Sequence, residues 1–334
     1  MRRIAFALPL LAALTAALFA AAPASAANFI ARTSASGTPG PSGEERYFAS
    51  GRAPVQAHSE HQGSRLVPYD PIPPVAPFES HTLAYSQATA LADMNGIHLR
   101  ADARGLIEDA KPFNTPGFSA SATASAGLGD SITIGAPGAV GMLHATAAFS
   151  VHALLSGVTQ VAGSMDPAIP GNAAVYLSWT ARLVVSGDNG ILGDLTLSGG
   201  CNSFTNVNDG LFKCGGDPLG LHSTTSFSFA SGETLSVGIE GEVRLMVIGA
   251  QERGGMASAS SVADFGNTMA WGGFQDVRDS LGNPVTGFTA LSASTGFNYA
   301  NPFPSAIPEP STWLLMLCGL AGLARLGQRR RCAG

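Results

Sequence analysis

Ser131 is the first candidate for chemistry, because the run Gly129-Asp130-Ser131-Ile132 places a hydroxyl directly after a carboxylate. A serine nucleophile needs a histidine to take its proton, and a carboxylate normally holds that histidine in place. The sequence contains no Asp-x-x-His motif and no Gly-x-Ser-x-Gly motif, the second being typical of a serine on a strand-to-helix turn. We therefore predict a turn that leads into a strand at 131–134, with no catalytic residue.

Glu240 and Glu242 are the second candidate, as a pair of carboxylates for acid–base chemistry. Residues i and i+2 of a strand share one face and lie roughly 7 Å apart. Inverting glycosidases hold their two carboxyl groups about 6.5–9.5 Å apart, so the spacing is permissive. Any solvated strand gives the same spacing, and Arg244 beside the pair is typical of charge compensation. We predict a solvated face and keep a secreted glycan-active hydrolase as an alternative.

Possible metal ligands occur in three places. The run His58-Ser59-Glu60-His61 offers three side chains, whereas His144 and His152 would lie about 26 Å apart along one strand and could not share an ion. The run Asn206-Val207-Asn208-Asp209-Gly210 has the oxygen ligands that calcium prefers, but such runs are also typical of turns. We predict no metal and no cofactor, with a calcium-binding module as an alternative.

Aromatic side chains offer a different kind of site. Tyr176, Trp179 and Trp271 could stack on a pyranose ring, as in a carbohydrate-binding module. Trp179 falls on the apolar face of a predicted strand, so we expect it to pack in the core.

The four cysteines fall into two classes. Cys201 and Cys214 lie among glycine and asparagine in the middle of the chain, and we predict that they form a disulfide in an oxidising compartment, with two free thiols as the alternative. A loop of this size stabilises a fold by about 3 kcal/mol in the chain-entropy model. Cys318 and Cys332 belong to the C-terminal tail and are not expected to join this bridge.

Strands must position these residues. The chain has 334 residues, of which 45% are hydrophobic and only 12% charged, with 41 glycines. Apolar and polar residues alternate over many segments, most clearly over 235–247. One face of this strand is expected to carry Leu235, Val237, Ile239, Val243, Leu245 and Val247, and the other Ser236, Glu240, Glu242 and Arg244. About eight to ten strands, each with one wet face, predict two packed antiparallel sheets in a β-sandwich or jelly-roll-like domain. Two further segments, 256–265 and 286–297, are also expected to be strands, and only 106–110 hints at a short helix.

The net charge and the composition of residues 27–80 bear on possible partners and on domain organisation. The net charge of −5 and the lack of a basic stripe argue against a nucleic-acid partner. Residues 27–80 contain eight prolines and no lasting periodicity, which predicts a disordered proline-rich leader.

The N-terminus has the three parts of a secretory signal peptide. Arginines follow Met1, an apolar run extends from Ile4 to Ala22, and small residues at Ala24 and Ala26 make a cleavage site. Cleavage after Ala26 by the Sec export machinery would make Ala27 the mature start. An uncleaved anchor helix is the alternative.

The C-terminus also has three parts: a proline-bounded motif, an apolar run over 314–324 and a cluster of arginines. Its recognisable residues are Pro308, Glu309, Pro310, Ser311, Thr312, Trp313, Arg325, Arg329, Arg330 and Arg331. This tail resembles the PEP-CTERM sorting signal of Gram-negative bacteria. The resemblance implies recognition of the tail by exosortase, a membrane protease-transpeptidase, in organisms that make exopolysaccharide. An ordinary tail anchor is the alternative.

These features divide the chain into a signal peptide (1–26), a disordered leader (27–80), a β-sandwich domain (81–300) and a sorting tail with a short transmembrane helix (301–334). We expect a non-enzymatic exported protein that is anchored in the inner membrane as a precursor. After processing, it would be delivered to the cell surface or to an extracellular matrix that contains exopolysaccharide.

Overall fold

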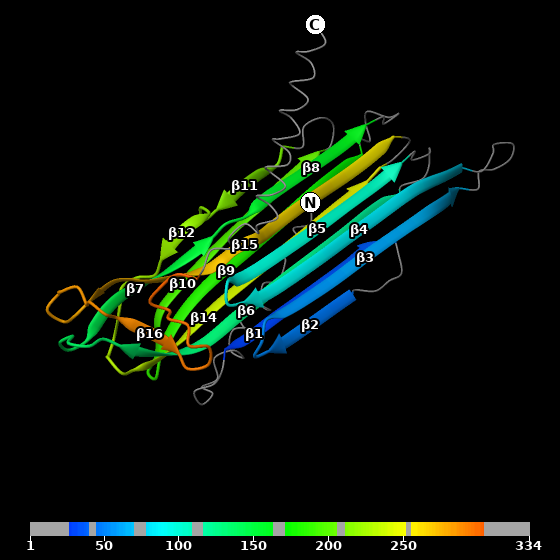
Figure 1. Cartoon of the computed structure of the whole chain (residues 1–334). Helices are drawn as coiled ribbons and strands as arrows, with labels where there is room; N and C mark the ends of the chain where they lie inside the picture. The colour runs from blue at the N-terminus through cyan, green and yellow to red at the C-terminus, as the bar shows by residue number, and fades with distance from the viewer. Residues whose placement is uncertain are drawn as a thin grey trace, which may run out of the picture. The chain divides into compact units, whose positions relative to one another are not determined.

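The computed structural model describes residues 27–39, 45–69, 78–108, 116–162, 171–205, 211–251 and 255–303, and every regular element in these ranges is a β-strand. The strands form two sheets in which all neighbours are antiparallel (Figure 1). The predicted class, mainly antiparallel β, is confirmed. The strands belong to one compact unit that ends at Phe303.

The first sheet has the order β11-β10-β9-β14-β6-β1-β2, with β16 also pairing with β6. Its strands are β1 (Asn28–Thr38), β2 (Glu45–Gly51), β6 (Gly117–Gly135), β9 (Asn172–Gly187), β10 (Gly190–Thr205), β11 (Lys213–Gly216), β14 (Thr234–Ala250) and β16 (Thr289–Ser292).

The second sheet has the order β12-β7-β15-β5-β4-β3, with β13 pairing with β7 and β8 with β15. Its strands are β3 (Val55–Tyr69), β4 (Phe78–Asp93), β5 (Gly96–Glu108), β7 (Leu143–Val151), β8 (Leu154–Ala162), β12 (Gly220–Ser223), β13 (Phe227–Phe229) and β15 (Met256–Arg278).

The two sheets pack face to face with their strands running along one common direction (Figure 1). Buried and exposed residues alternate along most strands, because successive side chains of a strand point to opposite faces. The predicted apolar face of β14 is confirmed: Leu235, Val243 and Val247 are buried, while Arg244 is exposed.

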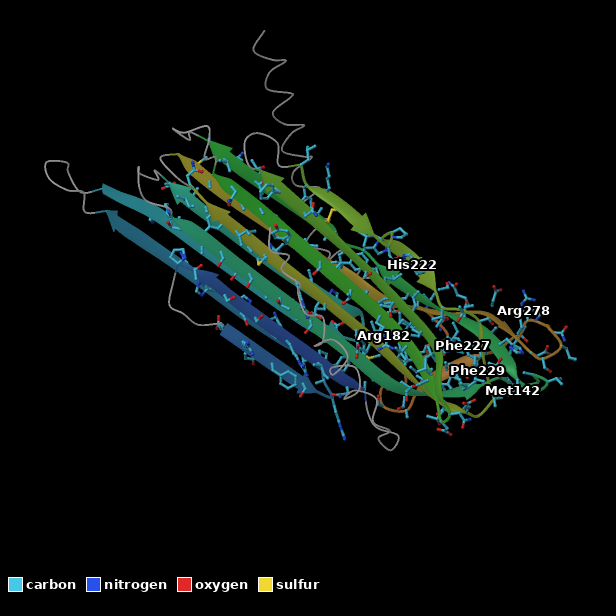
Figure 2. The ribbon with its side chains drawn as sticks, turned by 180° about the vertical axis from the view of Figure 1, so that it is seen from behind. Met142, Arg182, His222, Phe227, Phe229 and Arg278 are labelled. Carbon is cyan, nitrogen blue, oxygen red and sulfur yellow. A yellow bond between two sulfur atoms is a disulfide. The ribbon has the colours of Figure 1, made fainter. Side chains whose placement is uncertain are left out.

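The core differs in character between its two parts. Where β1 and β6 cover β3, β4 and β5, the inner face is mostly alanine, and the hydroxyls of Thr33 and Ser59 meet between the sheets at 2.7 Å. At one end of the sheets the core is aromatic, and Figure 2 shows Phe227 and Phe229 at the end where Met142 and Arg278 lie. The rings of Phe227 and Phe229 are 5.7 Å apart between centroids.

The predicted disordered leader over 27–80 is wrong for the residues described there, because β1, β2 and β3 occupy most of them. Apart from Phe29, the buried residues described in β1 and β3 are small or polar, among them Ala31, Thr33 and Ser59, so the sequence shows no alternation of large apolar side chains. Two of its prolines, Pro39 and Pro54, lie between strands. Pro68 lies near the end of β3, an edge strand, where a missing N–H is tolerated.

Two smaller expectations also need correction. The short helix expected at 106–110 is absent from its described part, because β5 continues to Glu108. The strand expected over 286–297 is limited to β16, which is followed by a turn. Residues 289–303, which comprise β16, this turn and the chain up to Phe303, pack against β6 and β15. We call them the closing segment.

Candidate functional site

Asp130, from the run first considered for a nucleophile, is the centre of a buried polar network. Its side chain is 5% exposed. The carboxylate accepts hydrogen bonds from the backbone N–H of Ser131 at 2.8 Å, the hydroxyl of Ser294 at 3.2 Å and the hydroxyl of Tyr299 at 3.0 Å. None of these donors is an imidazole, so Asp130 holds the closing segment in place and does not orient a histidine.

Tyr299 is fully buried and connects this network to the aromatic core. Burial raises the pKa of the Tyr299 phenol far above its ordinary value, and the charge of Asp130 and the hydrogen bond to it act in the same direction. The ring of Tyr299 contacts those of Trp271 and Phe303, with centroids 5.7 and 5.5 Å away. The phenol is therefore a neutral donor whose role is structural.

Glu240 and Glu242 lie on the outer face of the first sheet, as expected, but each has a different environment. Glu242 forms an ion pair with Arg244. Glu240 is the cross-strand neighbour of Arg182, which binds Asp194 through two hydrogen bonds of 2.9 and 3.1 Å. Arg182 belongs to β9 and is labelled in Figure 2.

The pKa of Glu240 is raised by burial, and the positive charge of Arg182 offsets this only in part because Asp194 opposes it. One Glu240 carboxyl oxygen, Oε1, is buried without a hydrogen-bond partner. Arg182 and Asp194 therefore form the better pair, and Glu240 is left as a poorly solvated third charge. This arrangement differs from two carboxylates flanking a substrate.

The candidate metal ligands do not converge. In β3, His58 and Glu60 are exposed, whereas His61 points into the core and is 7% exposed, because neighbouring residues of a strand face opposite ways. His144 exchanges a 2.8 Å hydrogen bond with Ser228. Within the described ranges, no group of three histidine, cysteine, aspartate or glutamate side chains is arranged to hold a metal ion. The possible calcium run 206–210 lies outside them.

An aspartate–histidine pair that the sequence analysis missed closes the β4–β5 hairpin. His98 Nε2 lies 3.8 Å from the Asp93 carboxylate, and His98 Nδ1 donates to the carbonyl of Gly266 at 2.6 Å. Interaction with Asp93 raises the pKa of His98, although burial opposes the shift. Burial alone would raise the pKa of the Asp93 carboxyl, but the interactions with His98 and Asn95 outweigh it and lower that pKa. The turn at Asn95-Gly96 lies between the two residues.

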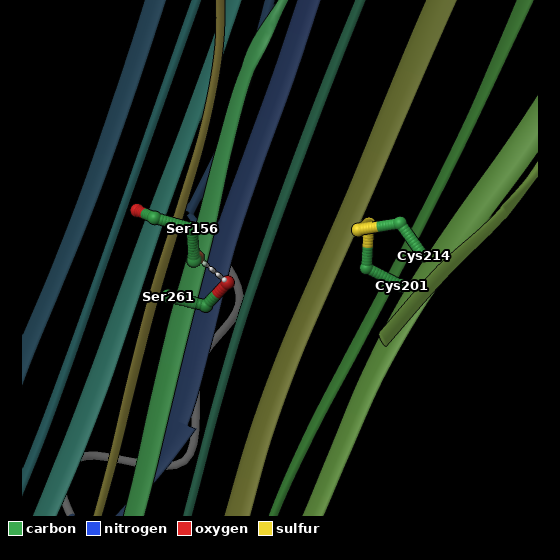
Figure 3. The surroundings of a disulfide bond; sticks show 4 residues. All are labelled: Ser156, Cys201, Cys214 and Ser261. Atoms are coloured by element: carbon green, nitrogen blue, oxygen red, sulfur yellow. Dashed lines mark hydrogen bonds between the residues drawn. A yellow bond between two sulfur atoms is a disulfide. The ribbon is translucent and has the colours of Figure 1, made fainter. Parts of the chain in front are cut away.

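The predicted disulfide between Cys201 and Cys214 is present (Figure 3). It joins directly paired residues of β10 and β11 at the edge of the first sheet. Figure 3 also shows Ser261 donating to the backbone carbonyl of Ser156, a 2.6 Å bond. Ser156 belongs to β8, so this bond adds a side-chain contact between the neighbouring strands β15 and β8.

Of the three aromatic residues considered for sugar stacking, two are in the core. Trp179 and Trp271 are 4% and 1% exposed, so neither offers a ring face to a ligand. Tyr176 is 44% exposed on the outer face of β9, opposite Asn202 of β10.

The residues of the two terminal signals lie almost entirely outside the described ranges. This applies to Ala24 and Ala26 and to the tail residues from Pro308 to Arg331, so their assignments stay predictions. Ala27 is described and precedes β1 directly. Within the described ranges there is no helix with the length and hydropathy needed to cross a membrane.

Comparisons with protein-family models, with curated proteins and with solved structures find no match to this chain.

Proposed function

We propose that the chain is an exported, non-enzymatic β-protein that is sorted to the cell surface or to an exopolysaccharide-containing matrix. The ordered combination of Pro308-Glu309-Pro310, an apolar run and terminal arginines carries this proposal. In this scheme the Sec machinery exports the precursor and the apolar run holds it in the inner membrane. Exosortase then recognises the Pro-Glu-Pro motif and removes the tail.

Features of the described residues support export and a structural role. The Cys201–Cys214 disulfide is compatible with an oxidising compartment outside the cytoplasm. Asp130 and Glu242, which were considered for chemistry, are engaged in contacts that stabilise the fold. A jelly-roll-like closure is also part of the proposal. The strands β3, β4 and β5 depart from it, because they are consecutive neighbours in a meander, whereas a jelly roll has Greek-key connections.

A carbohydrate-binding role is the second candidate, and the outer face of the first sheet favours it. Tyr176 presents an exposed ring there, with Asn202 and Met246 as its register partners. An aromatic ring beside an amide is a combination that binds the apolar face and the hydroxyls of a sugar. Calorimetric titration with exopolysaccharide fragments tests this candidate, and Tyr176→Ala must abolish the heat of binding if the candidate holds.

The proposed sorting is tested by intact-mass analysis of the protein from a native-like host, with and without its exosortase. We expect a form ending near Pro308 only in the strain that has the enzyme. Glu309→Ala should leave the tail attached, whereas Cys332→Ser, which lies behind the arginines, should be processed normally. An arginine tail that persists in both strains would identify the segment as a plain membrane anchor.

A further inference from the structure

The backbone nitrogen of Ala27 lies in a polar site inside the protein. Ala27 is 1% exposed, and its N–H donates a 2.9 Å hydrogen bond to Ser294 Oγ. Ser294 Oγ in turn donates to Asp130 Oδ1 at 3.2 Å. The first residue before β1 is therefore separated from a buried carboxylate by one hydroxyl group.

We propose that the free α-ammonium group of Ala27, created when the signal peptide is removed, binds in this site as the counter-ion of Asp130. The inference rests on the cleavage after Ala26 that is part of the proposed function. Signal peptidase adds water across the Ala26–Ala27 peptide bond. Ala26 leaves with the new carboxylate, and the new amino group of Ala27 takes up a proton and becomes a cation.

The charge of Asp130 is the first argument for such a partner. Among the residues that the structure describes, no arginine, lysine or histidine forms an ion pair with Asp130, and its hydrogen-bond donors are neutral. A buried carboxylate without an opposite charge is strongly unfavourable compared with a paired one. An ammonium group at Ala27 supplies that opposite charge without any side chain having to move into the core.

The geometry of the donors is the second argument. A peptide N–H has one proton to donate, and at Ala27 it goes to Ser294. An ammonium group has three, so it keeps this bond and has two further protons to donate. Among the described residues, the titratable groups in contact with this network are Asp130 from β6 and Tyr299 from the closing segment, and Tyr299 remains neutral.

This site would make the stability of the fold depend on export. Before cleavage the nitrogen of Ala27 is a neutral amide, and Asp130 has no counter-ion among the residues that the structure describes. After cleavage the same nitrogen is charged, and the strand β1, the closing segment and β6 are held together at one point. The precursor is therefore expected to be less stable than the mature protein.

Acylation of amines at neutral pH tests the inference on the exported full-length protein. The chain has only two lysines, Lys111 and Lys213, and Lys213 is exposed, so it serves as an internal reference. An ion pair raises the pKa of the α-amino group. Each unit of this increase reduces the fraction of reactive, unprotonated amine about tenfold at neutral pH. We expect the Ala27 amine to be acylated at least about tenfold more slowly, relative to Lys213, than the amine of a control chain.

The matched control carries two glycines inserted between Ala26 and Ala27, which moves the ammonium group away and leaves Asp130 intact. Asp130→Asn should accelerate acylation of Ala27 in the natural chain and have no effect in the control. If Asp130→Asn does not fold, the insertion alone decides. An Ala27 terminus that reacts as fast as the control would overturn the inference. Intact mass showing a retained leader would overturn the cleavage itself.

Discussion

The indole nitrogen of Trp271 donates a buried 2.7 Å hydrogen bond to the backbone carbonyl of Tyr299, and the hydroxyl of Tyr299 donates to Asp130. Three segments far apart in the sequence are thereby connected through two side chains. The closing segment has little strand structure of its own, since β16 contains only four residues. Its position therefore depends on these two bonds and the aromatic contacts around them as well as on the pairing of β16 with β6.

Trp271→Phe should destabilise the protein by about 1–3 kcal/mol, because the carbonyl of Tyr299 is left buried without a donor. Chemical denaturation followed by circular dichroism measures this change. Trp179→Phe removes a similar ring area from a core position next to Phe265 and is the control. Equal losses in the two variants would show that ring volume, rather than the hydrogen bond, sets the stability.

Gly105→Ala should destabilise the protein by about 1–3 kcal/mol through overpacking. A Cβ at this position of β5 would overlap the ring of Phe118, which extends across from β6. Gly129→Ala is the matched control, since a Cβ there meets no atom within 4 Å. Thermal denaturation gives the melting temperatures of both variants. A Gly105→Ala protein with the melting temperature of the wild type would contradict the close approach of the two sheets.

Glu240→Gln should stabilise the protein at pH 7 by about 1 kcal/mol. The substitution removes the negative charge of a carboxylate that is poorly solvated in the folded protein. Burial raises the pKa of Glu240 in the folded state, so its ionisation opposes folding at pH values above that pKa. The opposition disappears as the pH falls below the ordinary carboxyl value. Melting temperatures between pH 4 and 7 should therefore converge at the acidic end.

Glu242→Gln provides the comparison for this prediction, since Glu242 is paired with Arg244. It should leave the melting temperature unchanged or lower it slightly. A loss of stability in Glu240→Gln at pH 7 would show that attraction to Arg182 outweighs burial.

Asp93→Asn should cost about 1 kcal/mol at pH 5–6, where His98 is charged and the pair is complete. The pKa of His98 is raised in the folded state, so the pair stabilises fully below about pH 6.5 and the stabilisation is lost as the pH rises through the raised value. Melting curves from pH 5 to 8.5 should show that the difference in melting temperature between wild type and variant becomes smaller as the pH rises.

Glu108→Gln is the control for this pH series. Glu108 faces His81 at 3.5 Å, but both side chains are largely exposed, so solvent screens the pair. A difference for Asp93→Asn that stays constant with pH would exclude His98 as its source.

The sequence predicted the strands whose inner residues are large and apolar, and missed β1 and β3, whose inner residues are mostly small or polar. Alternation in β14 is unmistakable because leucine, valine and isoleucine recur at every second position. In β1 and β3 most of these positions carry alanine, threonine or serine, whose packing is decided by how closely the opposite sheet approaches.

The polar contacts divide in a similar way. Asp93 and His98 flank a turn signal, so a hairpin register alone would have brought them together. Arg182 and Asp194 also belong to one hairpin, but the register shifts between Ile191 and Gly193 and hides the pairing. The bond from Tyr299 to Asp130 joins residues 169 positions apart and depends on the order of strands in the sheets. Local sequence patterns do not contain that order.

The two ends of the described fold meet around Asp130, since Ala27 is bound to Ser294 and Phe303 packs on Tyr299. A short peptide linker from Phe303 to Ala27 could therefore close the domain into a ring without unpairing any strand. Such a circular permutant, reopened at the exposed turn around Gly282, should keep both sheets. The linear order of the chain is in that sense separable from the architecture it produces.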